Sequence, residues 1–290
     1  VAGFVLSRIG QREADFFDIK GIVEQLAEVV SVTATFKVLA LPYLSDGQAA
    51  QVLGRLGYAA IILEGAPKSE TIYKVFINKN GVKIAADNSL KMLGNYDLVE
   101  KMKKEYGDKI ACISIGPAGE MKLAAASVAF TDMELRPTRH AGRGGVGAVM
   151  GAKGVKVIVL DDKGMPNREP KNAEKFKEAN KNFVQGLKKH PVTGEGLPAY
   201  GTNVLTNVIN EAGGFPTNNF KMGRFAGVSK ISGETQAATE TARGGVVTHG
   251  CHKGCVIRCS GIYNDKDGNF LTKQPEYETI WAHGANCGID

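Results

Sequence analysis

The chain has 290 residues, 43% apolar and 23% charged, a balance typical of a soluble globular protein large enough for two domains. No apolar run approaches the ~20 residues of a transmembrane helix, and no basic flank or cleavage pattern marks a signal peptide. The net charge of +6 is spread along the chain, which argues against a nucleic-acid-binding protein.

Residues 1–163 have the pattern of a β-rich N-terminal domain. Short β-branched runs alternate with glycine and predict strands over residues 59–63, 71–77, 111–115 and 155–160. Residues 78–81 predict a hairpin turn, and residues 97–106 predict a short charged helix.

Residues 164–290 are expected to form a second, mainly helical domain, which follows a polar linker at residues 161–167. Phe176, Phe183 and Leu187 fall on one stripe and predict an amphipathic helix over residues 173–187. The predicted fold class is therefore α+β, with a mixed β-sheet domain followed by a helical domain.

The segment of residues 139–154 is rich in glycine and stands directly before the predicted strand at 155–160. Exposed amides in such a segment can bind phosphate oxygens, and Arg139 and Arg143 add bidentate donors. An equally good interpretation is a turn that packs a small-residue helix onto a sheet. The dinucleotide fingerprint does not fit, because its glycines follow a strand, and the P-loop lysine pattern is missing from this segment.

Three cysteines, Cys251, Cys255 and Cys259, lie within nine residues and predict a soft-metal site. Neighbouring basic residues favour the thiolate form that binds metal, whereas free core thiols would be expected in apolar surroundings. On a straight helix Cys251 and Cys259 would lie roughly 12 Å apart, so we expect the segment to bend at its glycines. The odd total of five cysteines argues against a secreted disulfide scaffold and for a reducing cytoplasm.

The fourth ligand of such a site stays open at this point. A four-iron cluster usually takes four thiolates, and Cys287 is a candidate from within the chain. His249 or His252 would instead suit a zinc site of three cysteines and one histidine. The spacing favours iron and sulfur only mildly, because zinc ligands more often come in two separated pairs.

Taken together, these motifs resemble the tungsten-containing aldehyde ferredoxin oxidoreductase family, whose members carry tungsten or molybdenum at a bis-pterin centre. The resemblance covers residues 47–290. Its segments occur in family order, at residues 54–65, 114–120, 136–154, 200–202, 210–220, 251–259 and 275–279. Joint occurrence in this order is more specific than any single motif.

The resemblance implies that the glycine-rich segment binds the pterin cofactor. In the family, an arginine and the residue after it contact the pterin phosphates, and a backbone carbonyl there helps to hold a magnesium ion. The matching positions in this chain are Arg139 and His140, followed by Gly142, Arg143 and Gly144.

The resemblance also implies that Cys251, Cys255 and Cys259 ligate a [4Fe-4S] cluster close to one pterin, and that Glu278 lies beside the metal as an acid or base. The implied activity is oxidation of a small aldehyde to a carboxylic acid, with electrons passing through the cluster to ferredoxin or another electron-transfer protein. We expect a homo-oligomer or a multi-subunit complex.

Three departures from the family pattern leave other functions open. The first cysteine spacing is one residue longer than is common in the family, and Leu44 and Asp46 replace an asparagine and a glycine that contact the pterin. Family members are also longer, so we expect a piece of a larger polypeptide that is inactive alone. The alternatives are an iron–sulfur electron-transfer subunit without pterin chemistry and a zinc-stabilised binding module.

Overall fold

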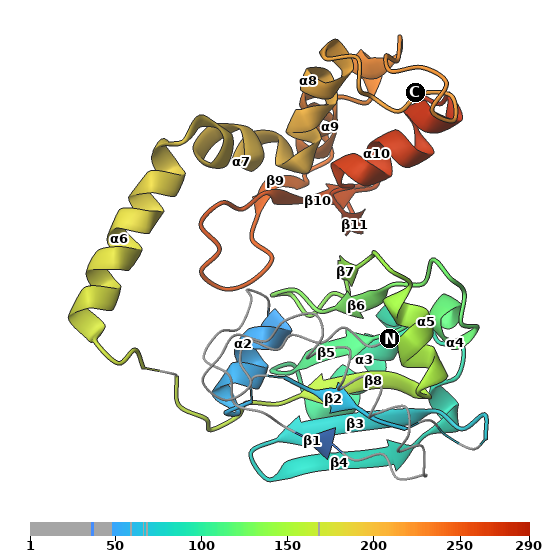
Figure 1. Cartoon of the computed structure of the whole chain (residues 1–290), viewed down its shortest axis with the longest axis vertical. Helices are drawn as coiled ribbons and strands as arrows, with labels where there is room; N and C mark the ends of the chain where they lie inside the picture. Colours follow the sequence, from blue (N-terminus) through green and yellow to red (C-terminus); the bar gives the residue numbers. More distant parts are fainter. Residues whose placement is uncertain (1–35, 38–47, 59, 66, 68, 168) are drawn as a thin grey trace, which may run out of the picture. The chain divides into compact units, whose positions relative to one another are not determined.

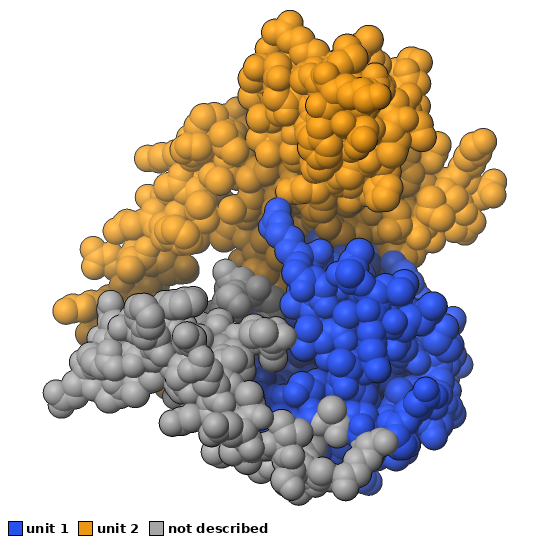
Figure 2. Space-filling model, turned by 45° about the vertical axis from the view of Figure 1, so that its right-hand side comes forward, with its two compact units in different colours: residues 1–168 blue, residues 169–290 orange. Residues whose placement is uncertain are grey.

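The computed structural model describes residues 36–37, 48–58, 60–65, 67, 69–167 and 169–290 (Figure 1). Leu44 and Asp46 lie outside these described residues. The chain divides into two compact units, residues 1–168 and residues 169–290, which Figure 2 shows in different colours. The sequence predicts this division at residue 163, a few residues before the boundary between the two units.

A six-stranded mixed sheet forms the centre of unit 1, with the strand order β4-β3-β8-β5-β6-β7. Strands β3 and β8 run parallel, and all other neighbours are antiparallel. The strands are β3 (Tyr73–Asn78), β4 (Gly81–Ala86), β5 (Ala111–Ser114), β6 (Val128–Phe130), β7 (Arg139–Ala141) and β8 (Val155–Leu160). A separate antiparallel pair joins β1 (Phe36–Lys37) to β2 (Ile62–Leu63). The predicted mixed sheet is thus confirmed.

Helices on both faces of this sheet bury β8 along its whole length (Figure 1). The helices of unit 1 are α2 (Gln48–Arg55), α3 (Asn95–Tyr106), α4 (Pro117–Glu120) and α5 (Val146–Ala152). Ile158 and Leu160 share a core cluster with residues of α2 and α5. Val157 and Val159 point to the opposite face and pack with residues of α3. A strand covered on both faces reads as a continuous apolar run, which is why the sequence identifies it.

The predicted hairpin turn and charged helix are confirmed. Asn78 pairs with Gly81 at the end of the β3–β4 hairpin, and Gly81 has a φ of +116° that favours glycine. Helix α3 begins two residues before the predicted range and ends at Tyr106. Gly107 then adopts a φ of +91° and its N–H bonds to the carbonyl of Lys103, which ends the helix.

Unit 2 combines helices with a small sheet. Its helices are α6 (Ala173–Lys189), α7 (Leu197–Tyr200), α8 (Leu205–Glu211), α9 (Gly233–Ala242) and α10 (Tyr277–His283). Strands β9 (Val246–His249), β10 (Ser260–Asn264) and β11 (Phe270–Lys273) pair antiparallel in the order β11-β10-β9. We did not predict this sheet, because its strands are short and both pairings contain register shifts that break the alternation of apolar and polar residues.

Helix α6 confirms the predicted helix over residues 173–187, but its apolar stripe is not buried. Asn172 caps the helix by accepting a hydrogen bond from the N–H of Lys175 at 2.9 Å. Phe176 and Phe183 are 58% and 67% exposed. In the described part of the chain, every helix is too short or too polar to cross a membrane.

Candidate metal and cofactor sites

The three clustered cysteines lie in the loop of residues 250–259 that joins β9 to β10, here called the cysteine loop (Figure 1). At its base, His249 pairs with Ser260 and forms a second backbone bridge with Cys259. Gly254 and Arg258 adopt left-handed φ values of +88° and +56°. The chain therefore bends between the cysteines, as their spacing predicts.

The ligand atoms of Cys251, His252 and Cys255 all lie within 4.8 Å of one another. One tetrahedral ion with metal–sulfur bonds of ~2.3 Å and metal–nitrogen bonds of ~2.0 Å holds its ligand atoms about 3.5–4 Å apart. A small closing movement would therefore bring these three groups onto one ion. Among the described residues, Cys259 is outside this group, so the structure joins two of the three predicted cysteines with a histidine.

The imidazole of His252 is oriented by the backbone. Its Nδ1 atom lies 3.0 Å from the carbonyl oxygen of Lys253. Because a carbonyl only accepts, Nδ1 of the neutral ring donates this bond and Nε2 carries the lone pair. The residue as a whole is 9% exposed. Metal-bound histidines are typically held by such a bond from their second ring nitrogen.

Burial and charge both act on the thiols of the cysteine loop. Burial raises the pKa of Cys259, and the negative charges of Glu276 and Cys255 raise it further. The N–H of Arg258 donates a hydrogen bond to the Cys255 sulfur at 3.4 Å. A cation bound beside crowded thiols reverses the penalty on their deprotonation. This donor set therefore fits a soft metal ion or an iron–sulfur cluster.

Two glycines of helix α5 are required by packing. A Cβ on Gly147 would lie 2.4 Å from the carbonyl oxygen of Ser127, and one on Gly151 would lie 1.9 Å from that of Gly119. Both distances are far shorter than van der Waals contact, so only glycine fits. For these two positions the structure supports the interpretation as a small-residue helix packed onto its neighbours.

Two glycines ahead of α5, Gly142 and Gly144, are not crowded by the described part of the chain. At Gly142 and Gly144 no atom of the described residues lies within 4 Å of an added Cβ, and residues 140–144 are exposed. Arg139 is half-buried on β7, and Nδ1 of His140 shares a 2.8 Å hydrogen bond with the hydroxyl of Ser127. Uncrowded backbone beside arginine side chains fits a phosphate-bearing cofactor.

Glu278 lies in the first turn of α10 and is exposed. Glu276, just before the helix, is held in place, because it accepts a hydrogen bond from the Thr202 hydroxyl and pairs with Lys273. Its charge also raises the pKa of Cys259. We did not single out Glu276 from the sequence, because only the fold brings it beside Thr202 and Lys273.

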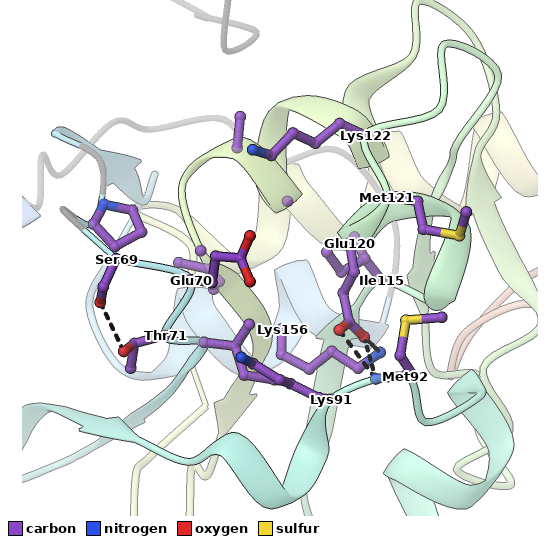
Figure 3. A pocket seen from close by; sticks show the side chains of 16 residues that line it. Ser69, Glu70, Thr71, Lys91, Met92, Ile115, Glu120, Met121, Lys122 and Lys156 are labelled. Carbon is purple, nitrogen blue, oxygen red and sulfur yellow. Dashed lines mark hydrogen bonds and ion pairs between the residues drawn. The ribbon is translucent and has the colours of Figure 1, made fainter.

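Unit 1 also contains a cavity of about 510 Å³, where Glu120 meets the buried Lys156 (Figure 3). The ammonium of Lys156 also donates to the carbonyl of Leu93 at 2.7 Å, and the N–H of Met92 donates to both Glu120 oxygens at 2.9 and 3.0 Å. Burial lowers the pKa of Lys156, although the bond with Glu120 opposes this. The pair ties the loop before α3 to α4 and β8. A lysine inside the apolar run of residues 155–160 is a sequence signal for such a buried pair, which we did not predict.

Two models of one family together match most of the chain. The model of the aldehyde ferredoxin oxidoreductase N-terminal domain matches residues 35–162, and the model of aldehyde ferredoxin oxidoreductase domains 2 and 3 matches residues 178–290. The chain belongs to the aldehyde ferredoxin oxidoreductase family. A third model, of the phenylalanyl tRNA synthetase beta chain CLM domain, matches residues 6–62, most of which lie outside the described residues.

Curated relatives agree with the aldehyde ferredoxin oxidoreductase models. The tungsten-containing aldehyde ferredoxin oxidoreductase of Pyrococcus horikoshii is 41% identical over 238 residues, which are 81% of this chain and 36% of the relative. The enzyme of the same name from Thermococcus kodakarensis is 38% identical over 235 residues, with the same coverage. The chain thus spans about a third of the length of these relatives.

More distant similarity extends to other oxidoreductases. A WOR-like subunit of an aliphatic sulfonate oxidoreductase from Pyrococcus furiosus is 27% identical over 250 residues, 80% of this chain and 37% of the relative. Among solved structures, the active-site complex BamBC of benzoyl coenzyme A reductase matches with a TM-score of 0.61 at 20% identity. That match covers 84% of this chain and 37% of the other, and it shows a shared fold.

Proposed function

We propose that this chain is part of an oxidoreductase that converts an aldehyde to a carboxylic acid at a tungsten or molybdenum bis-pterin centre and passes the electrons through a [4Fe-4S] cluster to ferredoxin. The main support for this proposal is that Cys251, His252 and Cys255 lie together in a chain whose two units both match one oxidoreductase family. The reaction consumes an aldehyde and water and yields a carboxylic acid, two protons and two electrons.

In unit 1, the segment around β7 would hold the pterin phosphates. Arg139 and Arg143 would donate bidentate hydrogen bonds to phosphate oxygens, with His140 beside them. The backbone at Gly142 and Gly144 would let phosphate groups or a magnesium ion approach closely, since no side chain of the described residues fills that space. The bound pterin centre would supply the two-electron chemistry of the reaction.

In unit 2, Cys251, Cys255 and Cys259 would hold the iron–sulfur cluster. The bends at Gly254 and Arg258 turn the cysteine loop so that its thiols can face a shared group. A partly buried loop would limit the access of water to the cluster. Solvent exposure is one of the factors that set the reduction potential of such a cluster. The loop would thus position the cluster for one-electron transfer to a partner protein.

Glu278 would move the proton at the substrate. Its carboxylate stands on the exposed face of the first turn of α10, where a substrate or a further part of the enzyme can reach it. General-base assistance of this kind is worth ~10² to 10⁴ in rate. In the complete enzyme, Glu278→Gln should lower aldehyde-dependent dye reduction by about that factor, with the metal content unchanged.

A second candidate function is a zinc-stabilised binding module. One observation favours it, because the three grouped ligand atoms lie at a spacing suited to one ion. Such a module would use the cysteine loop to stabilise unit 2 and would carry no redox chemistry.

The metals themselves discriminate these functions. We would purify the chain without oxygen from a host supplied with tungstate and molybdate, and then measure tungsten, molybdenum, pterin, iron, sulfide and zinc. If the chain is part of the oxidoreductase, the wild type should contain pterin and iron. Arg143→Ala should lose the pterin and keep the iron, and Cys255→Ser should lose the iron and keep the pterin. Iron and sulfide without pterin would indicate an electron-transfer subunit, and zinc alone would indicate the binding module.

A further inference from the structure

We propose that the Nε2 atom of His252 is a protein ligand of the metal group at the cysteine loop, beside the thiolates of Cys251 and Cys255. The proposal rests on the part of the proposed function in which this loop binds metal. It adds a nitrogen ligand to a site that the family resemblance assigns to cysteines alone.

The position of His252 supports ligation directly. One of its two ring nitrogens lies within 4.8 Å of the sulfur atoms of both cysteines, while the Cys259 sulfur is outside this group in the described part of the chain. The residue as a whole is 9% exposed, and the contact of Nδ1 with the Lys253 carbonyl orients its ring. Two thiols together with one imidazole form a mixed sulfur–nitrogen donor set, a combination found at both zinc and iron–sulfur sites.

The longer cysteine spacing of this chain supplies both the ligand and its support. Residues 252–254 separate the first two cysteines, one residue more than is common in the family. In this gap, the Nδ1–H group of His252 donates a hydrogen bond to the carbonyl oxygen of Lys253, with 3.0 Å between the nitrogen and the oxygen. The lone pair of the neutral ring is therefore on Nε2. Gly254 then turns the chain at a φ of +88°, which carries Cys255 back toward the ring.

The remaining cysteines are engaged elsewhere. Cys112 is fully buried in the sheet of unit 1, and burial raises its pKa to about 12. Cys287 lies in a short 3₁₀ helix (Ala285–Cys287), where its sulfur donates to the carbonyl of Ala282 at 3.3 Å. Neither belongs to the group of ligand atoms in the cysteine loop. His252 is thus the donor that this loop itself provides next to Cys251 and Cys255.

An imidazole ligand has a measurable consequence. A neutral imidazole in place of a thiolate removes one negative charge from the metal group, and this raises the reduction potential of an iron–sulfur cluster. His252→Cys should therefore keep the metal and lower the potential. His252→Gln should remove the nitrogen donor, and His249→Gln is the matched control, because His249 is also buried beside the loop but outside the ligand group.

The test uses the 290-residue chain in two parallel preparations, one loaded with iron and sulfide without oxygen and one loaded with zinc alone. In the iron preparation, pulsed EPR of the reduced protein should show ¹⁴N coupling that His249→Gln retains and His252→Gln loses. In the zinc preparation, chelator competition should show an affinity about tenfold or more weaker in His252→Gln alone. Either signature supports the ligand and identifies the metal.

Two outcomes would overturn the proposal, and they are distinguishable. A cluster that forms without nitrogen coupling, with zinc affinity unchanged in His252→Gln, would reject His252 as a ligand and leave the proposed function standing. A wild-type chain that takes up neither iron nor zinc would reject both.

Discussion

Gly151 in α5 lies so close to Gly119 in α4 that a Cβ on Gly151 would be 1.9 Å from the Gly119 carbonyl oxygen. This contact seats the helix that follows the candidate cofactor loop. Gly142, nine residues earlier, has no described atom within 4 Å of an added Cβ. One glycine-rich segment thus serves packing at its end and leaves its backbone accessible at its start.

Substitution should separate these two roles. Gly151→Ala should lower the free energy of unfolding by about 1–3 kcal/mol, because the added methyl group meets backbone that cannot move aside. Gly142→Ala should leave stability within about 0.5 kcal/mol of wild type. Urea unfolding measures both. Equal stability of the two variants would contradict the packing role of Gly151.

In unit 1, Glu120 and Lys156 form a buried ion pair, and substitution of one should lower the free energy of unfolding more than substitution of the other. Glu120→Gln leaves the fully buried Lys156 without its counter-charge and should cost about 3–5 kcal/mol. Lys156→Met should cost less, because Glu120 keeps its two bonds from the N–H of Met92. Glu100→Gln on the exposed face of α3 is the control for urea unfolding. A larger loss in Lys156→Met would contradict this account of the pair.

Glu240 should make stability depend on pH. Its side chain is fully buried in α9, both oxygens are without a hydrogen-bond partner among the described residues, and burial raises its pKa from 4.5 to about 7. Between these values the folded state holds a proton that the unfolded state has released. The free energy of unfolding should therefore fall by about 3 kcal/mol as pH rises through this window.

The neutral variant Glu240→Gln should flatten this dependence and be more stable than wild type at pH 8. Its control is Glu234→Gln on the same helix, whose carboxylate bonds to Asn207 at the surface. Chemical unfolding between pH 5 and 8 measures both. An unchanged pH slope in Glu240→Gln would show that another group is responsible.

The cysteines outside the loop should differ in reactivity. Burial raises the pKa of Cys112 to about 12, so its thiol stays protonated and shielded at pH 8. Cys287 is exposed. Iodoacetamide followed by mass spectrometry should modify Cys287 in the native chain and Cys112 only after unfolding. Rapid modification of native Cys112 would contradict its place in the sheet core.

The strands of unit 1 were predictable where one face or both faces of the strand are buried. The run of residues 155–160 is apolar except for Lys156 because both faces of β8 are covered, and the turn at Gly81 has a local signal. The sheet of unit 2 was not predictable, because irregular pairing hides its period. The exposed Phe176 and Phe183 show that periodicity identifies a helix without stating whether its apolar stripe is covered.

The candidate metal site was predictable in composition and less so in geometry. The spacing of Cys251, Cys255 and Cys259 was enough to predict a bend. Which ligand atoms meet depends on the left-handed turn at Gly254 and on the bond that orients His252, and both are properties of the folded backbone. Glu240 was missed for a similar reason, since only tertiary packing buries it.

The most direct test of the account is whether the cysteine loop holds a redox-active iron–sulfur cluster. Iron, acid-labile sulfide and zinc should be measured in the chain purified without oxygen, together with the EPR spectrum after reduction, for wild type and for Cys255→Ser. The account predicts roughly four irons with matching sulfide per wild-type chain, a reducible signal, and loss of both in the variant. Stoichiometric zinc with neither iron nor sulfide in the wild type would contradict it.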